Sequence, residues 1–411
     1  MVLLSEIPGG PNGDDPNNNP QEEEDNQNEN PQEVDENPQE EEEEVENLQE
    51  EVENLPILLE LPTDLIQRII AHIPRCYSPS PTLVCRALRQ VITSDELYVT
   101  RSLLGFTKPI LYALIRCTPY THPIWFFLCW SNIGLHLRRI RSLLPMFPGA
   151  AVVTIEYKMY VMGGTNPIGF TNQPVSTVIV IDCRFHTCNY LPCMQRPRFR
   201  AAAGEFDGRI YVIGGCKKQD ADWVEVFDVT TETWATVPSQ CPEDASENGE
   251  FITYVVMQGR IFILDLECCL AYEPGQGLWQ SWGGASQLMR FWQTSSSCVV
   301  GDLLYALDLT CTLGYPIVVY DPNELVWTPV LGGYSSYLPI LSNYRSKMAN
   351  FGGKLMIFCS YRGWFHDIWC IVIALETRQE NQIWGVFESI SLVFRDVMTM
   401  PSIELCRTVM V

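Results

Sequence analysis

The chain has 411 residues, of which 46% are hydrophobic, and a net charge of −23. It is long enough for a buried core and more than one domain. Residues 1–55 hold 20 of the 50 acidic side chains and no lysine or arginine, so the remaining chain carries a net charge of only −3. This distribution excludes a strongly basic body and gives no reason to expect a nucleic-acid partner. Apolar runs reach about eight residues, far below the roughly 20 needed to cross a bilayer, so we expect no membrane partner.

The first 55 residues are typical of a disordered acidic tail. The tetrapeptide Asn-Pro-Gln-Glu recurs from residues 19, 30 and 37, among further Glu, Asn and Gln. Such a composition offers too little apolar surface to offset the entropy cost of folding. We therefore expect the folded part of the chain to begin near residue 57.

The sixteen cysteines are spread through apolar segments rather than grouped in a disulfide framework. The N-terminal sequence MVLLSEIPGG has no basic region of the kind that begins a signal peptide. Cysteines used in this way behave as small apolar residues in a reducing compartment. We expect a soluble cytosolic or nuclear protein without disulfides.

Residues 57–105 predict a small module of three helices. Thr63 or Asp64 is expected to cap the first helix, and Pro74 to end it. A second helix with the same spacing follows, and a third begins after Ser94, its expected N-cap. The apolar residues of the first helix share one face: Leu65, Ile66, Ile69, Ile70 and Ile73.

The opening Leu-Pro of this module and its central Val-Cys-Arg (residues 84–86) resemble the pattern of the F-box. F-boxes dock on the Skp-family adaptor of cullin-RING ubiquitin ligases. An ordinary three-helix domain, with its apolar faces turned only inward, is the alternative interpretation. The resemblance implies an adaptor-binding role for Leu61, Pro62, Leu65, Ile66, Ile69, Ile70, Ile73, Pro74, Val84, Cys85 and Leu88.

Five segments of similar sequence follow this module. They are YKMYVMGG (157–164), GRIYVIGG (208–215), GRIFILDL (259–266), GDLLYALD (301–308) and GKLMIFCS (353–360). The Gly-Gly pair that ends the first two predicts positive φ or a close approach of another backbone. A tryptophan follows a turn in four repeats, and we expect it to fill space against a neighbouring repeat: Trp234, Trp279, Trp327 and Trp384.

Short strands at a period of about 45 to 50 residues, with Gly-Gly at the end of the second strand, resemble the kelch repeat, which is a blade of a β-propeller. The resemblance implies a mainly β fold for residues 106–411. Segments 111–130 and 392–411 each read as two strands, and together they would complete a sixth blade. We expect six blades, with five as the alternative. The combination of F-box and kelch repeats resembles the large plant F-box/kelch-repeat family over residues 57–411.

No set of residues typical of a catalytic site is recognisable. Neither G-x-S-x-G nor the Walker A sequence occurs. Cys183, His186, Cys188 and Cys193 lie within eleven residues, but their spacing fits no standard zinc site. We therefore expect no enzymatic activity, no metal and no cofactor.

Recognition of another protein is the function that remains. In a propeller blade, the loops between the second and third strands open on the same face as the loops between blades. Arginine and tryptophan dominate binding energies at protein interfaces, and this set would favour an acidic or aromatic segment. Ordinary solvated loop charge is the alternative interpretation. The residues expected to bind a client are Lys217, Lys218, Trp223, Arg290, Trp292, Arg345, Arg362 and Trp364, with Arg198, Arg200, Tyr334 and His366 as further candidates.

Two functions stay open at this point. In the first, the chain is the substrate-receptor subunit of an SCF-type cullin-RING ubiquitin ligase. Its helical module binds the Skp-family adaptor, and its propeller holds a client protein close to a catalytic subunit. In the second, the chain is a kelch interaction scaffold that acts without a ligase. Binding to the adaptor distinguishes the two.

Overall fold

The computed structural model divides the chain into two compact units, Met1–Pro56 and Ile57–Val411. All residues that it describes belong to the second unit. The acidic tail predicted for residues 1–55 lies outside them. The described residues are 61–73, 86–117, 122–131, 134–166, 173–220, 222–238, 241–266, 268–283, 287–292, 296–338, 346–359, 367–396, 399 and 401–411.

The helical module contains, among its described residues, α3 (Thr63–Ala71), α5 (Arg86–Ile92) and α6 (Asp95–Leu103). Ser94 is the N-cap of α6 as predicted, because its side chain accepts a hydrogen bond from the Leu97 N–H. The predicted cap of α3 is wrong. Pro62 occupies the N-cap position, and Thr63 is already helical.

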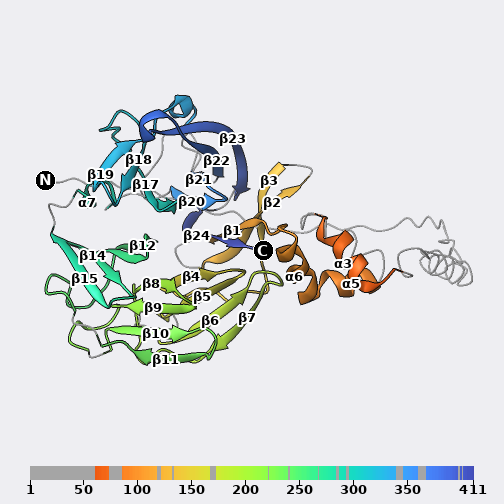
Figure 1. Ribbon diagram of the computed structural model, residues 1–411, viewed down its shortest axis with the longest axis horizontal. Helices are drawn as coiled ribbons and strands as arrows, with labels where there is room; N and C mark the ends of the chain where they lie inside the picture. Colours follow the sequence, from red (N-terminus) through yellow and green to blue (C-terminus); the bar gives the residue numbers. More distant parts are fainter. Residues whose placement is uncertain are drawn as a thin grey trace, which may run out of the picture. The chain divides into compact units, whose positions relative to one another are not determined.

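The described strands form six four-stranded sheets arranged around a common centre (Figure 1). The first blade contains β4 (Ala151–Ile155), β5 (Lys158–Met162), β6 (Val178–Asp182) and β7 (Thr187–Leu191). The second contains β8 (Ala202–Phe206), β9 (Arg209–Ile213), β10 (Val224–Asp228) and β11 (Thr233–Thr236). The third contains β12 (Thr253–Met257), β13 (Arg260–Leu264), β14 (Cys268–Glu273) and β15 (Leu278–Gly283).

The fourth blade contains β16 (Ser297–Val300), β17 (Leu303–Leu307), β18 (Ile317–Asp321) and β19 (Val326–Pro329). The fifth contains β20 (Lys347–Phe351), β21 (Lys354–Cys359), β22 (Asp367–Thr377) and β23 (Ile383–Arg395). The closing blade contains β24 (Ser402–Met410), β1 (Pro109–Arg116), β2 (Ile124–Ser131) and β3 (Gly134–Arg139). Short helices stand between strands: α7 (Met289–Trp292), η2 (Gly333–Tyr337) and η3 (Gln379–Asn381).

The first strand of each blade faces the centre of the ring. β4 contacts β8, β8 contacts β12, and the series continues through β16, β20 and β24 back to β4. Apolar side chains fill the space between blades; for example, Leu307 of the fourth blade and Ile357 of the fifth belong to one buried cluster. The fold is therefore the six-bladed β-propeller that the sequence predicted.

The closing blade is built differently from the prediction. It takes one strand from the C-terminal end of the chain and three from the segment after the helices, rather than two from each. β24 pairs along its length with β1, from Pro109 opposite Met410 to Arg116 opposite Ser402, and Figure 1 shows the two strands side by side. Residues 392–395 instead end β23 in the fifth blade. Trp125 lies on β2, the third strand, and not on the outermost strand that carries the repeat tryptophans.

The Gly-Gly pairs behave as predicted. Gly163, Gly164, Gly214 and Gly215 have φ values of 69°, 94°, 65° and 68°. A Cβ atom added at Gly163 would lie 2.5 Å from the carbonyl oxygen of Arg198, which belongs to the segment leading into the next blade. Both predicted reasons for glycine apply, the positive φ and the close backbone approach.

The repeat tryptophans lie on the outermost strands β11, β15, β19 and β23. Two of them connect blades by hydrogen bonds. Trp234 Nε1 donates to the carbonyl of Pro192, which follows the first blade, at 2.8 Å. Trp327 Nε1 donates to the carbonyl of Gln287, which follows the third blade, at 2.7 Å. Both tryptophans thus contact the segment that follows the preceding blade, as expected for a residue that packs against a neighbouring repeat.

Helix α6 contacts the turn between β6 and β7. Arg184 Nη1 lies 2.9 Å from Asp95 Oδ1, and the Tyr98 hydroxyl donates to the Arg184 carbonyl at 3.3 Å. The Arg184 guanidinium also lies over the ring of Tyr157, 3.7 Å from its centroid. One arginine of the first blade thus joins the helical module to the propeller through charge and ring contacts.

Candidate interaction surfaces

Helix α3 presents apolar side chains on two sides. Ile66 and Ile70 are buried, with 7% and 3% of their surface exposed, and pack against α5 and α6. Leu65 and Ile69 are 41% and 50% exposed. Pro62, just before the helix, is also exposed. Since Leu65 and Ile69 are four residues apart, they lie one turn apart on the same side of the helix. We call Pro62, Leu65 and Ile69 the α3 apolar surface.

The structure separates the predicted adaptor-binding residues into groups. Ile66, Ile70 and Leu88 are buried in the core of the module, so their predicted role as contact residues is wrong, and they hold the helices together. Leu61 packs partly against the same core, and Ile73 is half-buried. Pro74, Val84 and Cys85 lie outside the described residues.

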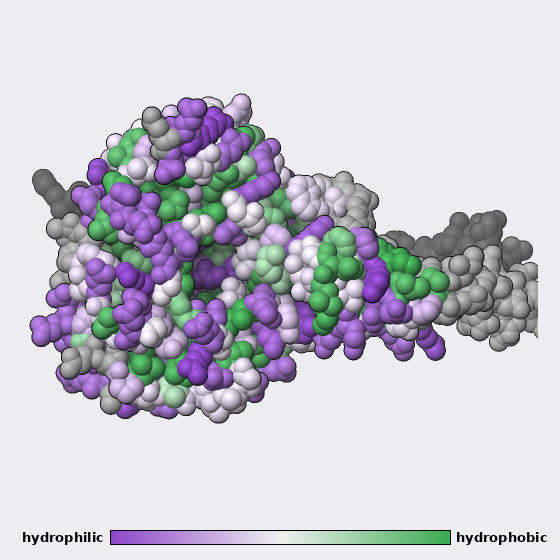
Figure 2. Space-filling model, in the orientation of Figure 1, coloured by the Kyte–Doolittle hydropathy of each residue, from purple (hydrophilic) through white to green (hydrophobic). Residues whose placement is uncertain are grey.

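A second group of exposed apolar residues, not recognised from the sequence, lies on α6 and just after it. Val99, Leu103 and Leu104 are 56%, 82% and 42% exposed. Figure 2 shows hydrophobic residues gathered on the helical part of the described unit. No signal in the sequence distinguishes them, because adjacent apolar positions of this module can both be buried, as Val91 and Ile92 are.

The predicted client-binding residues have varied environments. Lys217 lies on a loop and Arg290 in the short helix α7, and both side chains are exposed. Lys218 is half-buried, and its Nζ donates to the carbonyls of Glu243 and Ala245, so it anchors the connection to the third blade. Arg345, Arg362 and Trp364, with the further candidate His366, lie outside the described residues.

The prediction that Trp223 and Trp292 contact a client is wrong, because both side chains are buried. Trp223 is 2% exposed and packs against Trp279, with ring centroids 5.3 Å apart. Trp292 is 1% exposed, and its Nε1 donates to Ser297 Oγ at 3.1 Å. Both indoles fill the interior beside loops and are not available to a partner.

Arg198 and Tyr334, two of the further candidates, are also buried. Tyr334 is 1% exposed, and its hydroxyl donates to the Val330 carbonyl at 2.7 Å. The side chains of Arg198 and Glu225 have no exposed surface and form an ion pair of 2.7 Å. They are structural residues of the propeller.

A cavity of about 350 Å³ opens at the centre of the ring, where β4, β8 and β12 begin. Figure 2 shows a hollow in the middle of the ring with hydrophilic residues at its bottom. The cavity is lined by Gly149, Ala150, Val152, Arg200, Ala201, Phe251, Ile252, Thr253, Tyr254, Leu405 and Arg407. Arg407 was not recognised from the sequence, since it lies on the closing strand, outside any recognisable repeat.

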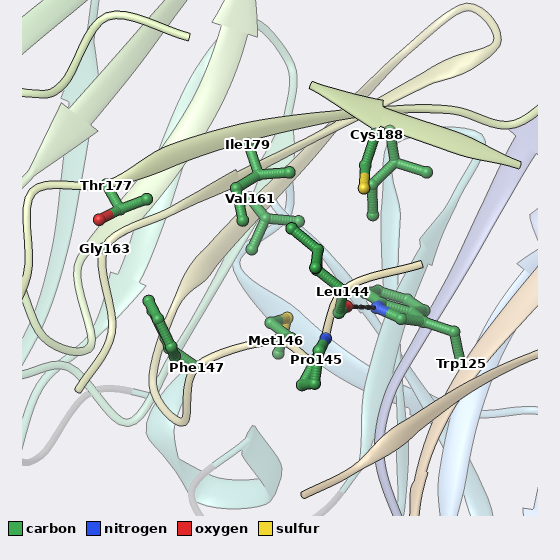
Figure 3. Close-up of a pocket in the computed structure, with 11 residues that line it drawn as sticks. Trp125, Leu144, Pro145, Met146, Phe147, Val161, Gly163, Thr177, Ile179 and Cys188 are labelled. Carbon is green, nitrogen blue, oxygen red and sulfur yellow. Dashed lines mark hydrogen bonds between the residues drawn. The ribbon is translucent and has the colours of Figure 1, made fainter. Parts of the chain in front are cut away.

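A second cavity lies between the first and closing blades and is too small for a ligand. It holds about 10 Å³, room for about one water molecule. Figure 3 shows apolar side chains on both sides of it, including Met146, Val161 and Ile179, and the hydrogen bond from Trp125 Nε1 to the Leu144 carbonyl (3.1 Å). This space is a packing gap in the core.

The cysteine and histidine cluster noted in the sequence is divided between core and surface. Cys183 is buried and Cys193 is exposed. His186 Nε2 is 3.0 Å from the Tyr112 hydroxyl. In the described part of the chain, no three His, Cys, Asp or Glu side chains are grouped so as to hold a metal ion.

Burial makes several thiols poor nucleophiles. Loss of solvent raises the pKa of Cys269, Cys359 and Cys406 to about 12. A pKa of 12 leaves about one thiolate in 10⁴ at pH 8, and only the thiolate reacts. A brief treatment of the folded protein with iodoacetamide at pH 8 should therefore label the exposed Cys193 and Cys311 but not these three.

Mass spectrometry of the digested protein measures this labelling residue by residue. Treatment in denaturant is the control, and it should label all five cysteines equally. Labelling of Cys269, Cys359 and Cys406 as fast as Cys193 in the folded protein would contradict their burial.

Among the residues that the structure describes, no helix combines the length and apolar content needed to cross a membrane.

Comparison with known proteins agrees with the geometry. The family model described as "FKB95, Kelch-repeats domain" matches residues 125–394, and the F-box domain model matches residues 58–100. Neither description names a catalytic activity.

Three relatives from Arabidopsis thaliana illustrate the similarity. The F-box/kelch-repeat protein At2g29830 is 65% identical, over the whole of both chains. The F-box/LRR-repeat/kelch-repeat protein At2g29770 is 44% identical, also over both whole chains. The F-box/kelch-repeat protein At2g29600 is 44% identical over 85% of each chain. With a helical module, a six-bladed propeller and these relatives, the chain belongs to the F-box/kelch-repeat family.

Proposed function

We propose that the chain is the substrate-receptor subunit of an SCF-type ubiquitin ligase. The helical module binds a Skp-family adaptor, and the propeller holds a client protein within reach of the ligase's catalytic subunit. The chain itself supplies no reacting group, and its contribution to catalysis is proximity. We further propose a cytosolic or nuclear location, because cysteines used as apolar strand residues suit a reducing compartment.

The observation that carries this proposal is the α3 apolar surface. Leu65 and Ile69 are large apolar side chains that remain 41% and 50% exposed although Ile66 and Ile70 on the same helix are buried. Burying a leucine or isoleucine fully stabilises a complex by roughly 1.5–3 kcal/mol. Exposed apolar groups of this size on a small module favour a protein partner.

The test is a binding titration of the full chain against a purified Skp-family adaptor. Changing Leu65→Asp and Ile69→Asp together should weaken binding at least 100-fold, because two charges would enter an apolar interface. Both positions are exposed, so the folded module should tolerate the change.

The matched control is Lys217→Asp, which changes an exposed propeller residue by a similar charge and should leave adaptor affinity unchanged. Unaltered binding of the Leu65→Asp/Ile69→Asp variant would contradict the assignment of this surface. Failure of the unaltered chain to bind any Skp-family adaptor would contradict the ligase function and favour the ligase-independent scaffold.

A further inference from the structure

Equivalent backbone positions of three consecutive blades meet at one end of the ring axis. Gly149, Arg200 and Phe251 each stand two residues before the first strand of a blade, at intervals of 51 residues. The Arg200 N–H donates to the Gly149 carbonyl at 2.8 Å, and the Phe251 N–H donates to the Arg200 carbonyl at 3.0 Å. The backbone of Arg200 is therefore held on both sides, with a φ of 54° that is uncommon for arginine.

All three positions line the cavity of about 350 Å³ at the ring centre. This volume lies within the range of binding pockets in proteins. Tyr254 crosses from β12 to β4, where its hydroxyl accepts from the Val152 N–H at 3.0 Å and donates to the Val152 carbonyl at 3.2 Å. The cavity thus has a wall that is fixed by hydrogen bonds.

Two arginines, Arg200 and Arg407, are among the residues that line this cavity. Arg200 lies near the ring of Phe199, at 5.2 Å, and Arg407 donates to the Cys406 carbonyl at 3.0 Å. Neither forms an ion pair with a described residue. Eight other arginines of the described chain do form ion pairs: Arg116, Arg184, Arg196, Arg198, Arg209, Arg260, Arg378 and Arg395.

Acidic residues nearby do not balance these two charges. Glu404, on the same strand as Arg407, pairs with Arg116. Glu205 of β8 accepts a hydrogen bond from the backbone of the following turn. Glu250 precedes the lining residue Phe251 and forms no ion pair with either arginine in the described structure. Two positive charges in a concave site attract an anion.

We propose that this cavity binds the carboxylate of an aspartate or glutamate in an acidic segment of the client protein. The proposal rests on the proposed function, which places the client on the propeller. Guanidinium groups bind carboxylates through paired hydrogen bonds. The apolar wall, which includes Ala201, Ile252 and Leu405, suits the methylene groups of such a side chain. The two charges also disfavour basic segments, so the cavity selects among clients.

The test is a selection of random twelve-residue peptides displayed on phage, against the full chain immobilised through its N-terminal end. Sequencing should show aspartate or glutamate enriched at a fixed position in the selected peptides. This enrichment should disappear with Arg200→Gln/Arg407→Gln and persist with Arg209→Gln. Arg209 is a matched control because it is exposed at the start of β9, away from the cavity.

A second measurement does not depend on the folding of a variant. Replacing the enriched acid of a selected peptide by its amide should raise the dissociation constant from the unaltered chain 10- to 100-fold. Selected peptides without acid enrichment, or acid enrichment that survives Arg200→Gln/Arg407→Gln, would overturn the proposal. Binding of free glutarate at micromolar concentration without enrichment of acidic peptides would overturn the assignment to a client side chain in favour of a small organic acid.

The adaptor titration is independent of this selection. Acidic peptides that bind through the two arginines, together with an adaptor that does not bind, would overturn the ligase function and leave the carboxylate site. An adaptor that binds, together with selected peptides that show no acid enrichment, would support the ligase function and overturn the carboxylate site.

Discussion

Changing Arg198→Met is expected to lower the free energy of unfolding by about 3–5 kcal/mol. The change removes one partner of an ion pair whose two side chains have no exposed surface, and Glu225 keeps a buried charge without a cation. Breaking a buried pair in this way costs about that much, because the remaining charge has lost water as well as its partner. Denaturant unfolding followed by tryptophan fluorescence measures the difference.

The position of Arg198 explains the size of this effect. Its Nη2 and Nε lie 2.7 and 3.1 Å from Glu225 Oε1 on β10. Its Nη1 also donates to the carbonyls of Gly214 and Trp223, on the segment between β9 and β10. One side chain from the connection between the first and second blades therefore satisfies several buried acceptors of the second blade.

Arg196→Met is the matched control. Arg196 is two residues away and pairs with Asp222 at 2.7 Å, but its side chain is 46% exposed. Exposed pairs contribute about 0–1 kcal/mol, so this variant should lose far less stability. Equal losses in the two variants would contradict a special role of the buried pair. The double change Arg198→Met/Glu225→Met should be more stable than Arg198→Met alone, since it removes the unpaired charge.

The repeat architecture could be predicted because its signals are local. A Gly-Gly pair indicates the backbone conformation of its own two residues. A tryptophan after a turn indicates a packing position within its own blade. The composition of the closing blade could not be predicted in the same way. The pairing of strands depends there on contacts between residues almost 300 positions apart in the sequence, in segments 109–139 and 402–410. In addition, neither segment contains a Gly-Gly pair.

Binding residues were harder to predict than the fold, because side-chain type does not reveal pairing or burial. Arg198 and Arg200 are two residues apart and equally basic, yet the first is buried against Glu225 and the second lines an open cavity. On α3 the apolar positions cover more than one face. Only the packing of α5 and α6 decides that Ile66 is buried and Ile69 exposed.

Changing Gly163→Ala is expected to destabilise the propeller by about 2–5 kcal/mol. At a φ of 69° a side chain costs about 1–2 kcal/mol of backbone strain. The new Cβ would also lie 2.5 Å from the Arg198 carbonyl oxygen. That oxygen cannot move freely, because it accepts a hydrogen bond from the Gly164 N–H at 2.8 Å. Relieving the contact therefore requires a shift of the backbone between blades, at a further cost of about 1–3 kcal/mol.

Gly208→Ala separates strain from crowding. Gly208 has nearly the same φ, 72°, but a Cβ there would meet no atom within 4 Å. Its replacement should cost only the strain, about 1–2 kcal/mol. Denaturant unfolding of both variants gives the comparison, and equal costs would show that the close approach to Arg198 has no energetic effect. Since Gly163 and Arg198 stabilise the same connection between blades, Gly163→Ala combined with Arg198→Met should cost less than the sum of the two single changes.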